Sequence, residues 1–153
     1  MKTNNQQERL KTSFWILGFT DGEGCFTISC INNSTTKFGK QIFPEFVISQ
    51  SSKSLEALKE IQKFFGCGSI VLNKRYDNHR ENMYKFCVRS ISELDSEIIP
   101  FFDKFQLKTS KNNDFKIFRK IIKMMKTKKH FSEKGFNKIL QFASEMNRKK
   151  KRL

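Results

Sequence analysis

The residues best suited to chemistry are two acids interleaved with glycines in the segment Asp21-Gly22-Glu23-Gly24. Glycine has no Cβ, so the backbone on either side of Glu23 can approach another backbone closely. A carboxylate in such a place could hold a hard cation beside a phosphate, or it could be an ordinary structural acid. A single acid does not separate these two readings.

The apolar run before the acids, residues 14–20, predicts a short helix after a polar lead, residues 1–12. Thr12 or Ser13 is available as its N-cap, and the glycines beside Glu23 are expected to end it. From Cys25 onward the hydrophobic period changes to two, which indicates a strand. The acids therefore lie where a helix turns into a strand.

The rest of the chain continues as strands and helices of one α+β domain, residues 1–153. Strands are predicted at residues 25–31, 42–50, 69–75 and 83–89, and helices at residues 54–65, 92–105, 113–127 and 132–147. This order, αββαββα with extra C-terminal helices, favours a four-stranded antiparallel sheet backed by helices. A basic tail follows, residues 148–153, which could contact phosphates or be a solvated end.

One face of the predicted sheet is too polar to be a buried layer. A solvated surface is the ordinary explanation, but a β-ribbon also fits the major groove of DNA. The expected DNA contacts on this face and its loops are Thr27, Ser29, Asn33, Lys37, Lys40, Gln41, Glu45, Ser49, Asn73, Arg75 and Lys85.

The charge of the chain favours a polyanionic partner. Thirty Lys and Arg residues against fifteen Asp and Glu give a net charge of +15, which would release counterions from nucleic acid. No apolar stretch approaches the roughly 20 residues of a membrane span, and the polar N-terminus shows no secretory signal. The four cysteines show no CxxC pairing, so a zinc site is not expected.

The segment Ile16-Leu17-Gly18-Phe19-Thr20-Asp21-Gly22-Glu23-Gly24 resembles the signature of the LAGLIDADG homing endonucleases. The similarity continues through Pro44 to Gln50, through Pro100 to Lys108, and into the C-terminal helices, so that it covers nearly the whole of residues 14–147.

The resemblance implies a site-specific DNA endonuclease that uses Mg²⁺. It assigns metal binding to Glu23 and the Gly22 carbonyl, positioning of water to Gln50, and stabilisation of negative charge to Lys108. Glu23 stands where Asp is commoner in the family. Ser54 falls where relatives can carry a basic residue, and whether the adjacent Lys53 replaces it is left open.

The presence of one motif implies a homodimer on a long, nearly palindromic site. Two copies of Glu23 meeting at a two-fold axis would repel each other unless cations lay between them. The expected interface residues are Trp15, Leu17, Gly18, Thr20 and Asp21. Leu17 and Thr20 replace the Ala and Val common in the family, which could alter the helix packing.

Alternatives are a maturase-like protein that binds intron RNA, a non-catalytic DNA-binding regulator, and a basic structural RNA-binding protein. The presence of the acid, the glutamine and the lysine argues against a purely RNA-binding role, although both activities could coexist in one protein. Loss of Glu23 or Lys108 would have favoured a non-catalytic regulator, and both are present. A structural RNA-binding protein would have no need of the acid between glycines. The abundance of Phe and Lys, with only two Pro, is typical of an A/T-rich genome. An organelle is the favoured source, with an A/T-rich bacterium or virus as the alternative.

Overall fold

The computed structural model describes residues 2–74 and 81–146 of the chain. In chain order the elements are α1 (Lys2–Glu23), β1 (Gly24–Asn32), β2 (Lys40–Ser51), η1 (Ser52–Ser54), α2 (Leu55–Phe65), β3 (Ser69–Asn73), β4 (Met83–Val88), α3 (Ile91–Glu93), η2 (Leu94–Ile98), α4 (Ile99–Lys104), α5 (Lys111–Lys126), η3 (Lys129–Phe131) and α6 (Glu133–Met146). The predicted α+β order is confirmed. Arg75 and the basic tail, residues 148–153, lie outside the described residues.

Helix α1 is much longer than predicted. It begins at Lys2, so the residues before the apolar run are helical, and neither Thr12 nor Ser13 is an N-cap. Their hydroxyls donate instead to carbonyls one turn earlier, Glu8 O at 3.0 Å and Arg9 O at 2.8 Å. Gln, Glu, Arg and Lys are good helix formers and extend a helix that a packed turn already holds. Because this extension has no apolar periodicity, the hydrophobic pattern did not reveal it.

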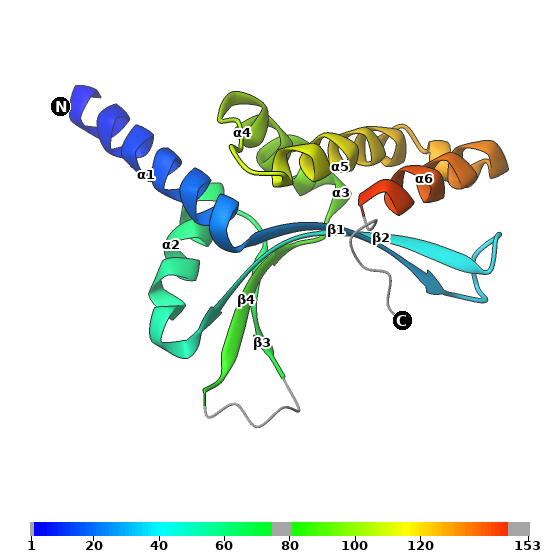
Figure 1. Ribbon diagram of the computed structural model, residues 1–153, viewed down its shortest axis with the longest axis horizontal. Coiled ribbons are helices and arrows are strands. Elements are labelled where there is room, and N and C mark those ends of the chain that lie inside the picture. The colour runs from blue at the N-terminus through cyan, green and yellow to red at the C-terminus, as the bar shows by residue number, and fades with distance from the viewer. Residues whose placement is uncertain (1, 75–80, 147–153) are drawn as a thin grey trace.

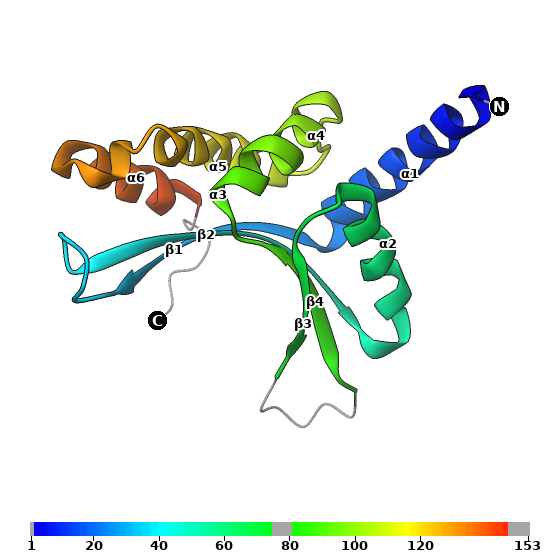
Figure 2. The same cartoon turned by 180° about the vertical axis from the view of Figure 1, so that it is seen from behind.

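The four strands form one antiparallel sheet in the order β1-β2-β4-β3. The sheet is curved into an arch, with all the α-helices on its convex side (Figures 1 and 2). The concave side faces away from them. We call this side, made by the odd-numbered residues of β1, β2, β3 and β4, the open face.

The other side of the sheet carries the core. The ring of Phe26 lies 5.0 Å from that of Phe46 on the neighbouring strand and 5.3 to 5.4 Å from the rings of Phe102, Phe115 and Phe118. One aromatic side chain thus joins the sheet to α4 and α5. The predicted apolar faces of the first two strands are confirmed, except that Cys30 is exposed near the end of the edge strand.

Helix α2 ends where predicted, at Gly66, which adopts the left-handed conformation with φ 66°. The next helix, α3 to α4, contains a π turn, η2, which ends at Ile98, two residues before Pro100. Proline has no amide hydrogen to donate, so a regular α-helical hydrogen bond is missing there.

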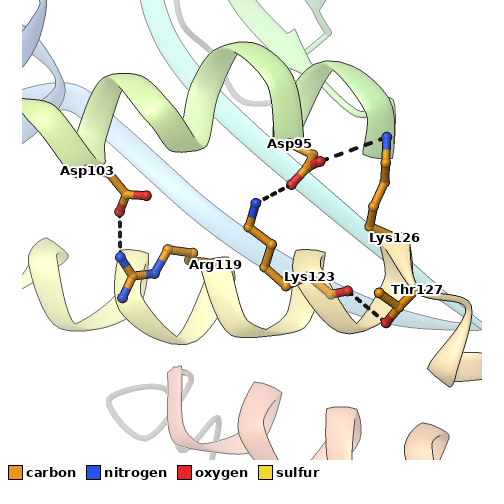
Figure 3. Close-up of polar contacts among 6 residues, drawn as sticks. All are labelled: Asp95, Asp103, Arg119, Lys123, Lys126 and Thr127. Carbon is orange, nitrogen blue, oxygen red and sulfur yellow. Dashed lines mark hydrogen bonds and ion pairs between the residues drawn. The ribbon is translucent and has the colours of Figure 1, made fainter.

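Ion pairs fasten this helix to α5, as Figure 3 shows. Asp103 pairs with Arg119 Nη1 at 2.5 Å, and Asp95 pairs with Lys123 Nζ at 2.6 Å and Lys126 Nζ at 3.8 Å. Helix α6 then packs on α5. No helix of residues 2–74 and 81–146 combines the length and apolar character needed to cross a membrane.

Candidate active site and nucleic-acid interface

The carboxylate of Asp21 fastens the end of α1 to the segment between α4 and α5. Its Oδ2 accepts a hydrogen bond from the backbone N of Lys108 at 2.7 Å, and its Oδ1 accepts from the backbone N and the hydroxyl of Thr109 at 3.1 and 2.7 Å. Burial raises the pKa of Asp21, but these hydrogen bonds and the charge of Lys111 outweigh it and lower the pKa below 3.8. Asp21 was expected at the subunit interface, whereas its carboxylate is used inside the subunit.

Lys111 caps the C-terminal turn of α1. Its ammonium donates to the carbonyl oxygens of Thr20 at 3.2 Å, Asp21 at 2.8 Å and Gly22 at 2.9 Å. The last carbonyls of a helix lack amide partners, and a cation there also interacts favourably with the helix dipole. Sequence reasoning missed Lys111, because these contacts join residues 89 to 91 positions apart and no local pattern predicts them.

Glu23 is the exposed last residue of α1. Within the described residues no hydrogen bond or ion pair engages its carboxylate. Asp21 holds Lys108 beside this end of the helix. Gly24 pairs with Ile48 in the sheet, so β2 carries Gln50, two residues further along, back alongside the same end. The fold therefore brings the segments that carry the three residues predicted to be catalytic to the same end of α1.

The donor set at this end fits a hard divalent cation only in part. Glu23 offers carboxylate oxygens, which such cations prefer. The Gly22 carbonyl, expected to contact the metal, accepts from Lys111 instead, although an oxygen has a second lone pair. Among residues 2–74 and 81–146 no three His, Cys, Asp or Glu side chains gather to hold a metal. At this end of α1 the described residues thus supply one uncommitted acid, Glu23.

Lys53 lies in η1, directly after the strand that carries Gln50. Its ammonium forms an ion pair with the carboxylate of Glu81, and this hydrogen bond raises the pKa of Lys53. The backbone N of Ser52 also donates to Asn82 O at 2.8 Å. Lys53, the residue considered in place of the family's basic residue, is therefore held by the segment before β4.

The sheet register places most of the predicted DNA contacts on the open face. Strand alternation and pairing assign to this face Thr27, Ser29, Gln41, Glu45, Ser49, Asn73 and Lys85. Asn33 and Lys37 lie in the turn between β1 and β2, where Asn33 Nδ2 donates to Gln41 Oε1 at 2.9 Å. Lys40 is exposed but pairs with Asn32, and the register puts it on the side that carries the helices.

The open face is less polar than predicted, since Val47 and the buried Cys87 also lie on it. Its charged cluster consists of Glu45, Lys85 and Arg89. Arg89 Nε donates to Glu45 Oε2, and Lys85 Nζ lies 3.7 Å from Glu45 Oε1. Sequence reasoning placed Arg89 on this face by alternation but left it out of the predicted DNA contacts.

The surface of α1 that faces away from the core contains two exposed glycines, Gly18 and Gly22, one turn apart. A Cβ at either position would meet no atom within 4 Å. Trp15, one turn before Gly18, is 37% exposed. Of the other predicted interface residues, Thr20 is fully buried within the subunit and Leu17 is partly buried against the core.

Comparison with known proteins agrees with this geometry. The chain matches the model of the LAGLIDADG endonuclease family over residues 16–122. It is 35% identical over 132 residues to the probable intron-encoded endonuclease 2 of Neurospora crassa, a match that covers 86% of this chain and 26% of that protein. The chain spans about a quarter of the length of the two curated relatives from Neurospora crassa that it matches, the probable intron-encoded endonucleases 2 and 3.

Solved structures share the fold along nearly the whole chain. The homing endonuclease I-TnaI is 43% identical with a TM-score of 0.78, and the match covers 88% of this chain and 87% of that one. I-SmaMI, bound to its uncleaved DNA target in the presence of calcium ions, is 32% identical with a TM-score of 0.80, and the match covers 88% of this chain and 44% of that one. With the motif, the fold and these matches in agreement, the chain belongs to the LAGLIDADG endonuclease family.

Proposed function

We propose that this chain is a subunit of a site-specific endonuclease that cuts double-stranded DNA with the help of divalent metal ions. The observation that carries the proposal is the exposed, uncommitted carboxylate of Glu23, with the anchored Lys108 and the end of the strand bearing Gln50 beside it. The endonuclease names of the relatives and the DNA-bound structure of I-SmaMI support it. They do not favour the RNA-binding and regulatory alternatives.

The substrate is proposed to lie along the open face. That face is curved and is not covered by the helices (Figure 1). By the strand register it carries polar side chains on two adjacent strands, which together have the form of a β-ribbon. The net charge of +15 favours binding to phosphates by counterion release. DNA on this face would pass the end of α1, because β1 begins directly after Glu23.

Each residue near the end of α1 has a distinct proposed role. Glu23 holds the cation, for which we propose Mg²⁺, together with oxygens of the substrate phosphate. A cation bound there would polarise the phosphate and make a bound water more acidic. Lys108 offers an exposed ammonium to the negative charge that develops on the phosphate. Gln50 can both donate to and accept from a water molecule, and so can orient it.

We further propose that the active unit is a homodimer joined along α1. One subunit supplies one uncommitted acid, whereas a clamp for two metal ions needs at least two. Gly18 and Gly22 let a second helix approach the backbone of α1 closely. Phe14, 57% exposed, and Trp15 flank this glycine surface and would be buried by the approach. I-SmaMI, whose chain is about twice as long as its matched part, is compatible with a second copy supplying the other half.

The cleavage test uses duplex DNA from the insertion site of the intron that encodes the protein. Wild type is expected to cut with Mg²⁺ and to bind without cutting with Ca²⁺ or a chelator. Glu23→Gln should bind the same DNA but cut at least about a thousandfold more slowly, because a catalytic metal would lose its carboxylate. Equal cutting by the two proteins would refute the role of Glu23. If the protein cut the RNA of the intron that encodes it and left the DNA intact, duplex DNA would not be the substrate.

The dimer test uses Gly18→Leu, with Gly18→Ala as the graded control. The structure has open space at this position, so the leucine should leave the subunit folded while blocking the approach of a second helix. Light scattering should give a dimer for wild type and a monomer for Gly18→Leu, with little change in melting temperature. A wild-type protein that remains monomeric at working concentration on its cognate DNA would contradict the homodimer.

An origin in an organelle intron is the last part of the proposal. One relative, of Podospora anserina, is named as a protein in ND4 intron 1, and others are named as intron-encoded. The nucleotide sequence on either side of the coding gene would test this origin. An uninterrupted gene outside any intron would contradict it.

A further inference from the structure

We propose that Glu45 is a positioning residue that holds Arg89 and Lys85 as one cationic unit on the open face, and that Arg89 thereby selects guanine at one position of each half-site. This inference rests on the proposed function, because it assigns a target feature to the same DNA-binding face. It differs from the sequence prediction, in which Glu45 itself was expected to contact DNA.

Glu45 is poorly placed to contact a base. Its side chain is only 15% exposed, and both of its carboxylate oxygens face cations, Arg89 on Oε2 and Lys85 on Oε1. Its backbone oxygen also accepts from the hydroxyl of Thr27 at 3.3 Å. A carboxylate pointed at DNA would repel the phosphates. Here one acid is shielded by two bases, so the cluster keeps a net positive charge toward the substrate.

Arg89 is held by one edge and exposed at the other. Its Nε donates a hydrogen bond to Glu45, whereas its two terminal nitrogens donate none to any described residue. The guanidinium carbon lies 5.7 Å from the centre of the Phe43 ring, and the side chain is 43% exposed. The ion pair and the ring thus restrain the side chain while its two-pronged end stays accessible.

That end matches one base better than the others. The paired N–H groups of an arginine fit the O6 and N7 acceptors that guanine presents in the major groove, and lysine lacks this fork. An arginine already fixed by an acid loses less side-chain entropy when it binds. The pair of Glu45 with Arg89 should therefore sharpen base selection more than it strengthens binding.

The experiment measures relative cleavage of cognate duplexes in which each base pair is substituted in turn. The variants are Glu45→Gln, Arg89→Lys and Arg89→Ala. The matched controls are Glu56→Gln, which breaks an ion pair with Lys59 on α2, and Arg119→Lys, which alters the pair with Asp103 on the helical side (Figure 3). Both control pairs lie away from the open face.

Wild type should prefer guanine at one half-site position by about ten- to a hundredfold, the range typical of a two-pronged contact. Glu45→Gln and Arg89→Lys should reduce this preference to about threefold or less at that position and leave the others unchanged. Because Glu45→Gln removes a negative charge, it should also bind non-cognate DNA more tightly than wild type does. The controls should keep the wild-type profile.

Two results would overturn the inference while the proposed function stands. One is an unchanged preference profile for Glu45→Gln and Arg89→Ala. The other is an equal loss at all positions together with weaker non-cognate binding and a lower melting temperature, which would mark Glu45 as merely structural. A wild-type protein that neither binds nor cuts duplex DNA would overturn the proposed function, and this inference with it.

Discussion

The end of α1 and the open face of the sheet use acids and lysines in opposite ways. At the end of α1 the backbone holds the charges: amides hold Asp21, and helix carbonyls hold Lys111. On the open face charged side chains hold one another, with Glu45 between Arg89 and Lys85. The first arrangement leaves Glu23 and Lys108 uncommitted, and the second leaves cations directed toward a substrate.

This difference predicts which of the two regions can be substituted without loss of the fold. A charge held by backbone groups depends on the fold, so its position is the same whatever DNA is bound. A charge held by another side chain can be replaced by substitution with little effect on the fold, since exposed ion pairs contribute little to stability. We expect chemistry to depend on the end of α1 and target choice to depend on the open face.

Among the substitutions that test this comparison of the two regions, Asp21→Asn is expected to have the largest effect. The amide would place an N–H₂ group near the backbone amides of Lys108 and Thr109, which need acceptors, and the Lys108 segment would lose its fixed position. We expect the cleavage rate to fall about a hundredfold and the free energy of unfolding to fall by about 1–2 kcal/mol, as for a lost hydrogen bond to a charged group. Single-turnover kinetics and urea denaturation measure the two. The control Asp103→Asn should keep the wild-type rate, and a rate within twofold of wild type for Asp21→Asn would contradict the assignment.

The salt dependence of DNA binding should separate the two regions. Lys85→Met on the open face should weaken binding several-fold and reduce the slope of log affinity against log salt by about 0.9, the value for one lost phosphate contact. Lys111→Met should leave the slope unchanged, because that ammonium is committed to carbonyls. Fluorescence anisotropy over a salt series gives both slopes. Equal slopes for Lys85→Met and Lys111→Met would contradict the distinction between the open face and the end of α1.

A smaller effect is expected on stability when the cap of α1 is removed. Lys111→Met takes the ammonium from three helix carbonyls, and we expect the free energy of unfolding to fall by about 1 kcal/mol. Lys116→Met, an exposed lysine of the same helix, is the matched control and should fall within experimental error of wild type. Thermal and urea denaturation measure the difference. A Lys111 variant as stable as the control would show that water replaces the cap without loss.

The smallest effect concerns acid pH. The pKa of Asp21 is lower in the folded than in the unfolded chain, so its stabilisation is complete above the unfolded value near 3.8 and is lost as pH falls through the lower folded value. Asp21→Asn should therefore show a shallower loss of stability than wild type below about pH 4. Urea midpoints measured over a pH series give the two slopes. Identical slopes would mean that other carboxylates determine the acid limit.

Most of the elements could be predicted from local patterns. The alternation in Phe26 and Ile28 gave the buried face of β1, and the spacing of Leu58, Ile61 and Phe65 before Gly66 gave α2. These predictions succeeded because a strand or helix with one buried face repeats its apolar residues at a fixed period. The start of α1 could not be found in this way, because residues 2–12 contain no regular spacing of apolar residues.

The candidate site was only partly predictable. Its three expected catalytic residues came from the family resemblance, and the fold brings the segments that carry them to the same end of α1. The supporting residues did not follow from the motif. Asp21 and Thr20 were both expected at the subunit interface, yet Asp21 anchors Lys108 and Thr20 is fully buried within the subunit. Helix periodicity places a residue on a face, but which face meets the core depends on the packing partners.

The sequence by itself determined the α+β order, the family, the net positive charge and the acid at the junction of helix and strand, because each of these is written in residue types and short spacings. Only the tertiary structure decided that Lys111 reaches back to cap α1, that Asp21 holds the backbone of Lys108, and that Glu45 lies between Lys85 and Arg89. Those contacts join residues 40 or more positions apart. They form because the packed core brings the segments together, which no local spacing can specify.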